Sequence, residues 1–340
     1  MQYHLYLSRY LVLLPLFLFT LLTPNMAEAK TPPPAATPPP STDRGLSAFA
    51  PVMGGLSLLP APFSMFTYTG VHSTSIDQQR LSILTPLYRD EKNRFTAMAN
   101  AANLHLDRGP ILRKTGTKVP TEFYRTEVGG HYSHELSDAR HLALRGSLGY
   151  ASDKPFQDKQ DLIFNLNGSY SFPGNEYSFW ALTLFVSNNS PIANYIPIPG
   201  FLYFYKKNNL TGVFGLPMAS LQWKPVQPWA FSFFLFGPTI NLEAAYSLEN
   251  RMQLFVASNW SQQSFFRSSR TRQDDRIIFE EKRGVLGLKS PLGRTLHGEA
   301  QIGYAFDRSI YEGDGFLNRD RGSAPIDDSW FAQINLRYSF

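Results

Sequence analysis

The sequence predicts an all-β fold, a transmembrane antiparallel up-and-down β-barrel, on three observations. Apolar and polar residues alternate over long stretches, most clearly in "DLIFNLNGSYSF" at 161–172. Aromatic residues make up 14% of the chain and charged residues only 17%. No stretch beyond the N-terminal segment has the 3.6-residue period of an amphipathic helix. Strands with a period of two can face lipid on one side and line a polar interior on the other.

The N-terminal segment predicts export. Arg9 precedes an apolar run at 11–22, and Ala27-Glu28-Ala29 has the pattern of a cleavage site. This order is typical of a secretory signal peptide, which we place at residues 1–29. The net charge of +5 is spread along the chain, so the sequence indicates no nucleic-acid partner. The chain has no cysteine, so disulfides cannot supply its stability.

Residues 30–62 are expected to be a proline-rich periplasmic linker. Proline fixes φ and lacks a backbone donor, so "KTPPPAATPPPSTDRG" should be extended and unpaired. The apolar part at 46–62 has three open interpretations: a plug inside the barrel, a short arm packed at its periplasmic mouth, or a loose leader. The barrel itself is predicted to occupy residues 63–340.

About 14 strands are predicted from alternating segments and the links between them. They start near Phe63, Gln78, Arg94, Thr121, Arg140, Asp161, Tyr177, Gly212, Trp229, Ile240, Met252, Ile277, Thr295 and Trp330. Short links mostly alternate with long ones, as in outer-membrane barrels. If Gly237-Pro238 does not form a turn, an even number of strands would require 12 instead.

Aromatic residues near the expected strand ends favour a membrane barrel over a soluble sandwich, because interfacial girdles have this pattern. The set is Tyr88, Tyr150, Phe172, Trp180, Trp223, Trp229, Trp260 and Trp330. In hydrocarbon an open sheet edge would leave backbone groups without partners, so the sheet is expected to close.

The last strand, "DDSWFAQINLRYSF", resembles the C-terminal signal of bacterial outer-membrane proteins. The residues that carry this likeness are Ile334, Leu336, Tyr338 and Phe340. The resemblance implies the outer membrane of a Gram-negative-type cell, with lipid, barrel-insertion machinery and periplasmic chaperones as partners. "GSLGYASDKPF" at 146–156 also resembles uncharacterised outer-membrane barrel families, which implies no activity.

Polar positions of the alternating strands should line the lumen. The candidates are Arg125, Glu127, His141, Arg145, Asp161, Asn165, Asn167, Glu243, His297, Glu299 and Arg337. Their mixed charges do not predict ion selection. The apolar segment 189–209 is expected either to fold into the lumen or to add a strand above the membrane through Phe201 to Lys206. The sequence indicates no cofactor and no metal site.

One stretch, "GGHYSHE", has residue types suited to acyl transfer. His131 and Ser133 share a strand face, and Glu135 could orient the histidine. The stretch resembles outer-membrane lipid hydrolases, but it lacks the longer Gly- and Asn-bearing motif of outer-membrane phospholipase A. Its His and Ser should also point to the lumen rather than to lipid.

The leading functional hypothesis is therefore a pore or transporter for small solutes. The alternatives are a lipid-modifying hydrolase and a closed structural or adhesive barrel.

Overall fold

The computed structural model describes residues 64–136, 139–190, 194–316 and 318–339. All of them belong to the compact unit formed by residues 43–340. The expected signal peptide, linker and possible plug, and Phe340, lie outside the described residues. Within the described residues, no helix has both the length and the apolar character needed to cross a membrane.

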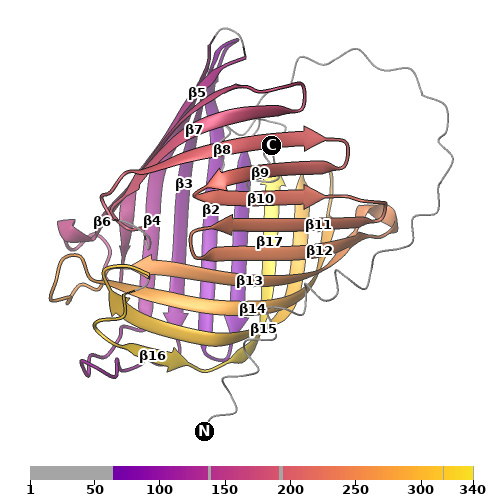
Figure 1. The fold of residues 1–340 in the computed structure, drawn as a ribbon. Coiled ribbons are helices and arrows are strands. Elements are labelled where there is room, and N and C mark those ends of the chain that lie inside the picture. Colours follow the sequence, from indigo (N-terminus) through magenta and orange to yellow (C-terminus); the bar gives the residue numbers. More distant parts are fainter. Residues whose placement is uncertain (1–63, 137–138, 191–193, 317, 340) are drawn as a thin grey trace. The chain divides into compact units, whose positions relative to one another are not determined.

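The described chain is built from antiparallel strands (Figure 1). They are β1 (Met65–Ser73), β2 (Ile76–Arg89), β3 (Asn93–Leu106), β4 (Glu122–Glu135), β5 (His141–Ser152), β6 (Leu162–Pro173), β7 (Ser178–Ser187), β8 (Ile198–Lys207), β9 (Leu210–Leu216), β10 (Met218–Trp223), β11 (Trp229–Phe236), β12 (Thr239–Ser247), β13 (Gln253–Phe265), β14 (Arg276–Pro291), β15 (Leu296–Gly313), β16 (Ser323–Ile326) and β17 (Ser329–Ser339). Two short 3-10 helices, η2 (Lys159–Asp161) and η3 (Glu249–Arg251), lie in the links.

Sixteen of these strands close into one barrel. Each strand from β1 to β15 pairs with the next, β15 pairs with β17, and β17 pairs with β1. The closing pair joins Met65 to Ser339 and Ser73 to Phe331 without a register shift. β16 pairs only with the outer part of β15 and takes no place in the ring. Closure gives every strand of the ring two neighbours, so no edge is left unpaired.

The barrel class is as predicted, but the expected 14 strands and the alternative of 12 are both wrong. Gly237-Pro238 does form a turn between β11 and β12, which excludes 12. Segment 198–207, expected in the lumen or above the membrane, is the barrel strand β8. The expected single strand from Gly212 to Trp223 is broken at Pro217 into β9 and β10.

β8 escaped prediction because it does not alternate in polarity. Leu202 and Phe204 lie on the face whose partners include Ala181 and Val213, and Phe201 and Tyr203 on the opposite face. Both faces are thus apolar, and a short continuous apolar run is ambiguous by period alone.

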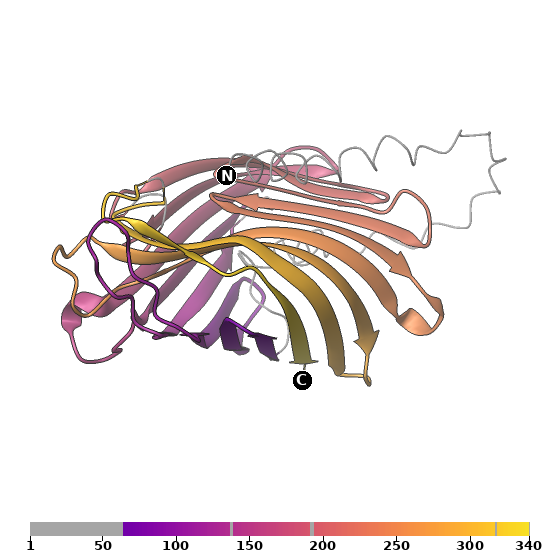
Figure 2. The ribbon, with the colours of Figure 1, turned by 90° about the horizontal axis from the view of Figure 1, so that it is seen from below.

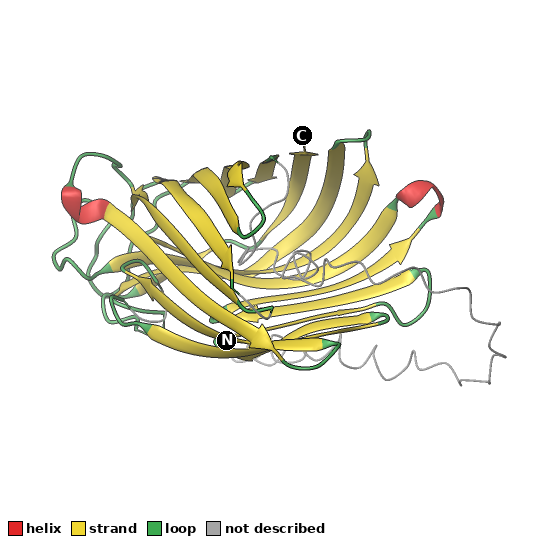
Figure 3. Ribbon diagram, turned by 90° about the horizontal axis from the view of Figure 1, so that it is seen from above, coloured by secondary structure: helices red, strands yellow, loops and turns green. Residues whose placement is uncertain are grey.

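The links divide the barrel into two ends, seen from two sides in Figures 2 and 3. At the short-turn end, tight links join β2 to β3, β4 to β5, β6 to β7 and β8 to β9. At the long-loop end, longer links join β3 to β4, β5 to β6, β13 to β14 and β15 to β17. The link between β9 and β10 also lies at the long-loop end but consists of Pro217 alone.

Strand length varies strongly around the ring. It is 14 residues in β2, β3 and β4, falls to 7 in β9 and 6 in β10, and rises to 16 in β14 and 18 in β15. The wall of the barrel is therefore much shorter along the strand direction at β9–β10 than on the opposite side.

Candidate functional site: the barrel interior

The register separates an outward apolar face from an inward face. Val128, Leu148, Ile302 and Trp330 alternate with inward residues and are 50–71% exposed. Aromatic side chains gather near both ends of this outward face. Trp180 and Tyr203 contact one another at the short-turn end, and Tyr304 and Trp330 do so at the long-loop end.

A polar network covers the inner wall of β4, β5 and β6. Its centre is the Glu127 carboxylate, which lies 3.2 Å from Arg125 Nε. The same carboxylate accepts hydrogen bonds from Ser147 Oγ at 3.0 Å and from Asn165 Nδ2 at 3.1 Å. Arg80 of β2 also occupies an inward position and is exposed, so this part of the interior is accessible to solvent.

A second network covers the inner wall of β12, β14, β15 and β17. Lys289 Nζ contacts Glu243 Oε1 at 2.5 Å, and Asn335 Nδ2 donates to Glu299 Oε1 at 2.8 Å. Arg283 forms a salt bridge with Glu281, and Glu281 Oε2 also lies 3.7 Å from Arg308 Nε. Side chains of both signs thus neutralise one another along the wall.

An apolar track runs up the inner wall of β7–β11 between the two polar networks. Phe179 and Phe204 stack near the short-turn end, with ring centroids 4.2 Å apart. Leu202, Val213 and Met218 continue the track and are almost fully buried. Phe234 and Phe236 pack against the same cluster from β11. The inner wall is therefore apolar along this side, and only Phe179, Phe234 and Phe236 of the cluster remain partly exposed.

The long-loop end is closed by an apolar seal. Its buried side chains are Ile76, Leu104, Leu106, Leu112, Val119, Phe123, Ala151, Ile163, Phe265, Phe266, Ile277, Phe279, Ile310 and Ala324. Phe123 of β4 and Phe265 of β13 meet with ring centroids 5.1 Å apart. Phe266 N donates to Ala151 O at 2.7 Å, which joins the ends of β5 and β13. These strands lie on opposite sides of the ring, so the contact crosses the interior.

Buried charges hold the loops over this seal. Arg270 Nη1 lies 2.5 Å from Asp161 Oδ1, and both side chains are almost inaccessible, at 4% and 0%. Arg267 Nη2 lies 2.8 Å from Glu312 Oε1. Arg276 donates to the carbonyl oxygens of Asn188 and Asp314, at 2.6 and 3.1 Å. Links that are distant in sequence are thereby tied into one cover.

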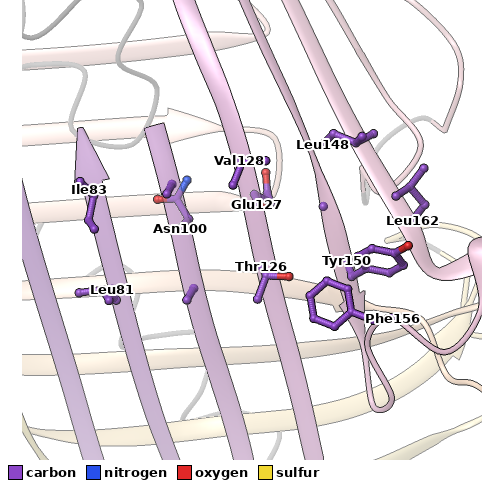
Figure 4. A pocket seen from close by; sticks show the side chains of 13 residues that line it. Leu81, Ile83, Asn100, Thr126, Glu127, Val128, Leu148, Tyr150, Phe156 and Leu162 are labelled. Carbon is purple, nitrogen blue, oxygen red and sulfur yellow. The ribbon is translucent and has the colours of Figure 1, made fainter. Parts of the chain in front are cut away.

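A groove of about 330 Å³ lies on the outward face, not in the interior (Figure 4). Leu81 and Ile83 of β2 line one side, and Leu148 and Tyr150 of β5 line the other. Phe156, from the β5–β6 link, contacts Tyr150 with ring centroids 4.6 Å apart. Its wall is almost entirely carbon, so it is a feature of the apolar outer surface.

The structure places most of the expected lumen residues on inward positions of strands. These are Arg125, Glu127, His141, Arg145, Asn165, Asn167, Glu243, His297, Glu299 and Arg337, as the paired registers give them. Asp161 lies instead in η2, within the cover of the long-loop end. The apolar track and the seal were not predicted, because inward apolar residues cannot be told from outward ones by sequence when both faces of a strand are apolar.

The histidine and serine of "GGHYSHE" also lie on the inner face. The register sets His131 beside Thr96 and Arg145, and Ser133 beside Arg94 and Ala143. His131 is 5% exposed. Both side chains are therefore separated by the barrel wall from the outward surface that a lipid hydrolase would use. Among the described residues, no group of three or more His, Cys, Asp or Glu gathers as a metal site would require.

Fold and interior together define a closed 16-stranded antiparallel barrel with an apolar exterior and a partly polar interior. No family model matches the chain, and no curated protein matches it. The solved structures that it resembles are outer-membrane β-barrel proteins. One is a deletion mutant of the monoaromatic hydrocarbon channel TodX, with a TM-score of 0.36 and 8% identity over 87% of this chain and 95% of that one.

Another is an outer membrane channel from Pseudomonas putida F1, with a TM-score of 0.33 and 9% identity over 83% of this chain and 97% of that one. A third is the KdgM porin, with a TM-score of 0.28 and 8% identity over 81% of this chain and 99% of that one. Similarity at this level does not transfer a function to this chain.

Proposed function

We propose that the protein is a gated conduit for small solutes in the bacterial outer membrane. The observation that carries the proposal is the contrast between the two faces of one closed wall. The outward face exposes apolar side chains such as Val128 and Trp330, and the inward face holds the Glu127 and Glu299 networks. In water such an outer surface would be a liability, whereas in lipid it is the stable arrangement.

The dimensions support a membrane location. Trp330 and Tyr338 lie eight residues apart on the outward face of β17. Eight residues of a strand tilted by about 40° rise roughly 20 Å, close to the apolar band of outer-membrane barrels. The outward positions of Ile334, Leu336 and Tyr338 also support the proposed recognition of this strand by the barrel-insertion machinery.

Gating follows from the seal. The polar interior contains accessible groups such as Arg80, but the seal around Phe123 and Phe265 blocks a straight path to the long-loop end. A permanently open pore is therefore not what this conformation supports. The seal equally favours a second candidate, a closed barrel that only presents its loops.

Reconstitution separates the two candidates. The folded protein would be inserted in planar bilayers, and conductance would be recorded for the native chain and for a Phe123→Ala/Phe265→Ala variant. A conduit should show rare openings that become frequent in the variant. Absence of conductance in the native chain and in the variant, together with no solute entry in liposome swelling, would favour the closed barrel that only presents its loops.

A further inference from the structure

The described wall of the barrel is shortest at β9–β10. β9 has 7 residues and β10 has 6, and a single residue, Pro217, joins them. At about 3.3 Å per residue and a tilt near 45°, six to seven residues rise only about 14–16 Å, against an apolar band of about 25 Å. Figure 1 shows these strands between the longer β8 and β11.

Beside β8 the deficit falls at the long-loop end, since Leu216 is the partner of Phe201 and β8 begins at Ile198. Aromatic residues anchor the short-turn end of this wall, since Trp223 lies on β10 and Trp229 contacts Tyr246. The tip of the β9–β10 hairpin at 216–218, which we call the rim, therefore lies closer to the short-turn end than the end of β8 does, and the β11–β12 turn lies level with it because Met218 is the partner of Phe236. The rim suits that place, because Leu216 is 75% exposed and Pro217 has no N–H that would need a partner. The adjacent β11–β12 turn carries Pro238 in the same way.

The apolar track ends behind this rim. Phe185 of β7 and Phe236 of β11 meet there edge to face, with ring centroids 6.2 Å apart. Three strands, β8, β9 and β10, separate β7 from β11 around the ring, so the two rings close over the hairpin tip. A small cavity of about 20 Å³ lies at this point, lined by Phe185, Phe236, Met218 and Pro217 among others.

We propose that the rim is a lateral portal through which small apolar solutes pass between the barrel interior and the membrane, with Phe185 and Phe236 as its gate. The inference rests on the proposed conduit function and names its solute class. A solute that moves along the apolar track toward the long-loop end meets the seal at that end and the rim in the adjacent wall. Leaving sideways keeps such a solute in apolar surroundings throughout, which avoids the cost of returning it to water.

Solute entry into proteoliposomes tests the gate. The probes are a monoaromatic hydrocarbon and a small neutral sugar, and the variant is Phe185→Ala/Phe236→Ala. Losing one aromatic contact should raise the open fraction, and with it hydrocarbon entry, about two- to tenfold. Sugar entry should stay unchanged. Phe255→Ala is the matched control, because Phe255 faces inward from the 13-residue strand β13, away from the rim.

The accessibility of a spin label to membrane-dissolved oxygen tests the portal independently of any transport measurement. Phe236→Cys and Arg80→Cys variants would each carry one nitroxide, since the chain has no other cysteine. At an open rim, a label at 236 should be relaxed by oxygen dissolved in the bilayer more than by a water-soluble nickel chelate. The label at 80, on an exposed inward position of β2, should show the reverse.

Together, the two measurements distinguish a failure of the portal from a failure of the conduit function. Sugar entry or conductance with a label at 236 that responds only to the nickel chelate would overturn the portal and leave the conduit in place. Absence of entry of either probe, in every variant, would overturn the conduit function and the portal with it. Equal acceleration of sugar and hydrocarbon by the double substitution would also overturn the portal, since the rings would then gate a watery path.

Discussion

Replacing Asp161 by Ala should destabilise the barrel far more than an exposed charge change at the same end. The carboxylate is fully buried and lies 2.5 Å from Arg270 Nη1. The guanidinium would keep its bonds to Gln160 O and Gln273 O and its contact with Phe266, but it would lose its counter-charge. Removing one partner of a buried pair typically costs about 3–5 kcal/mol.

The assay is equilibrium unfolding in urea, with the barrel held in detergent or lipid vesicles and followed by tryptophan fluorescence. The control is Arg108→Gln, because Arg108 and Asp107 are largely exposed and such pairs contribute about 0–1 kcal/mol. An Asp161→Leu/Arg270→Met variant should regain most of the lost free energy of unfolding, since apolar replacement of a buried pair is often neutral.

Two results would refute this reasoning. One is an Asp161→Ala variant that unfolds within about 1 kcal/mol of the native chain, as expected of a surface pair. The other is a double variant that is less stable than the single one.

Three further predictions concern the wall, a turn and the polar interior. Gly149→Ala should destabilise by about 1–3 kcal/mol in the same unfolding assay, because the new Cβ would lie 1.8 Å from Thr126 O, whereas Gly168→Ala meets open space and should be silent. Hydrogen bonds from Tyr88 and Asn93 lower the pKa of Asp90, in the β2–β3 turn, below its ordinary 3.8. The ionised Asp90 carboxylate therefore contributes its full stabilisation above that ordinary pKa and loses it as pH falls through the lowered value. The difference in unfolding free energy between the native chain and Asp90→Asn should accordingly be constant near neutral pH and shrink only in strong acid. Glu127→Gln removes the negative partner of Arg125, and reversal potentials in a salt gradient should shift toward anion selectivity, with no shift counting against an interior path past β4.

The barrel could be predicted from the sequence because lipid contact imposes a strict period of two. β5, β6 and β17 show that period over most of their length, with Leu144, Leu166 and Ile334 outward and Arg145, Asn167 and Asn335 inward. The polar candidates were found for the same reason, since a polar residue in such a strand has only the interior to face.

The prediction failed where both faces are apolar. β8 has apolar residues on its outward face and contributes to the apolar track on its inward face, so its sequence shows no alternation of polarity. The predicted number of strands was therefore too low. The seal was missed because Phe123 and Phe265 meet only when β4 and β13 approach across the interior. Such contacts depend on how the ring is flattened, which no local pattern records. The role of Asp161 was missed likewise, since its partner lies in a link 109 residues away.

Arg276 has a consequence for how the cover responds to binding. One guanidinium reaches the main chain of three separate links, at Asn188, Asp274 and Asp314. A loop tethered only to its own strands can shift alone, but these three share an anchor and would be released together. A ligand that displaces any one of these links would therefore disturb the other two, so that a local change at one link would reach the whole long-loop end of the barrel at once.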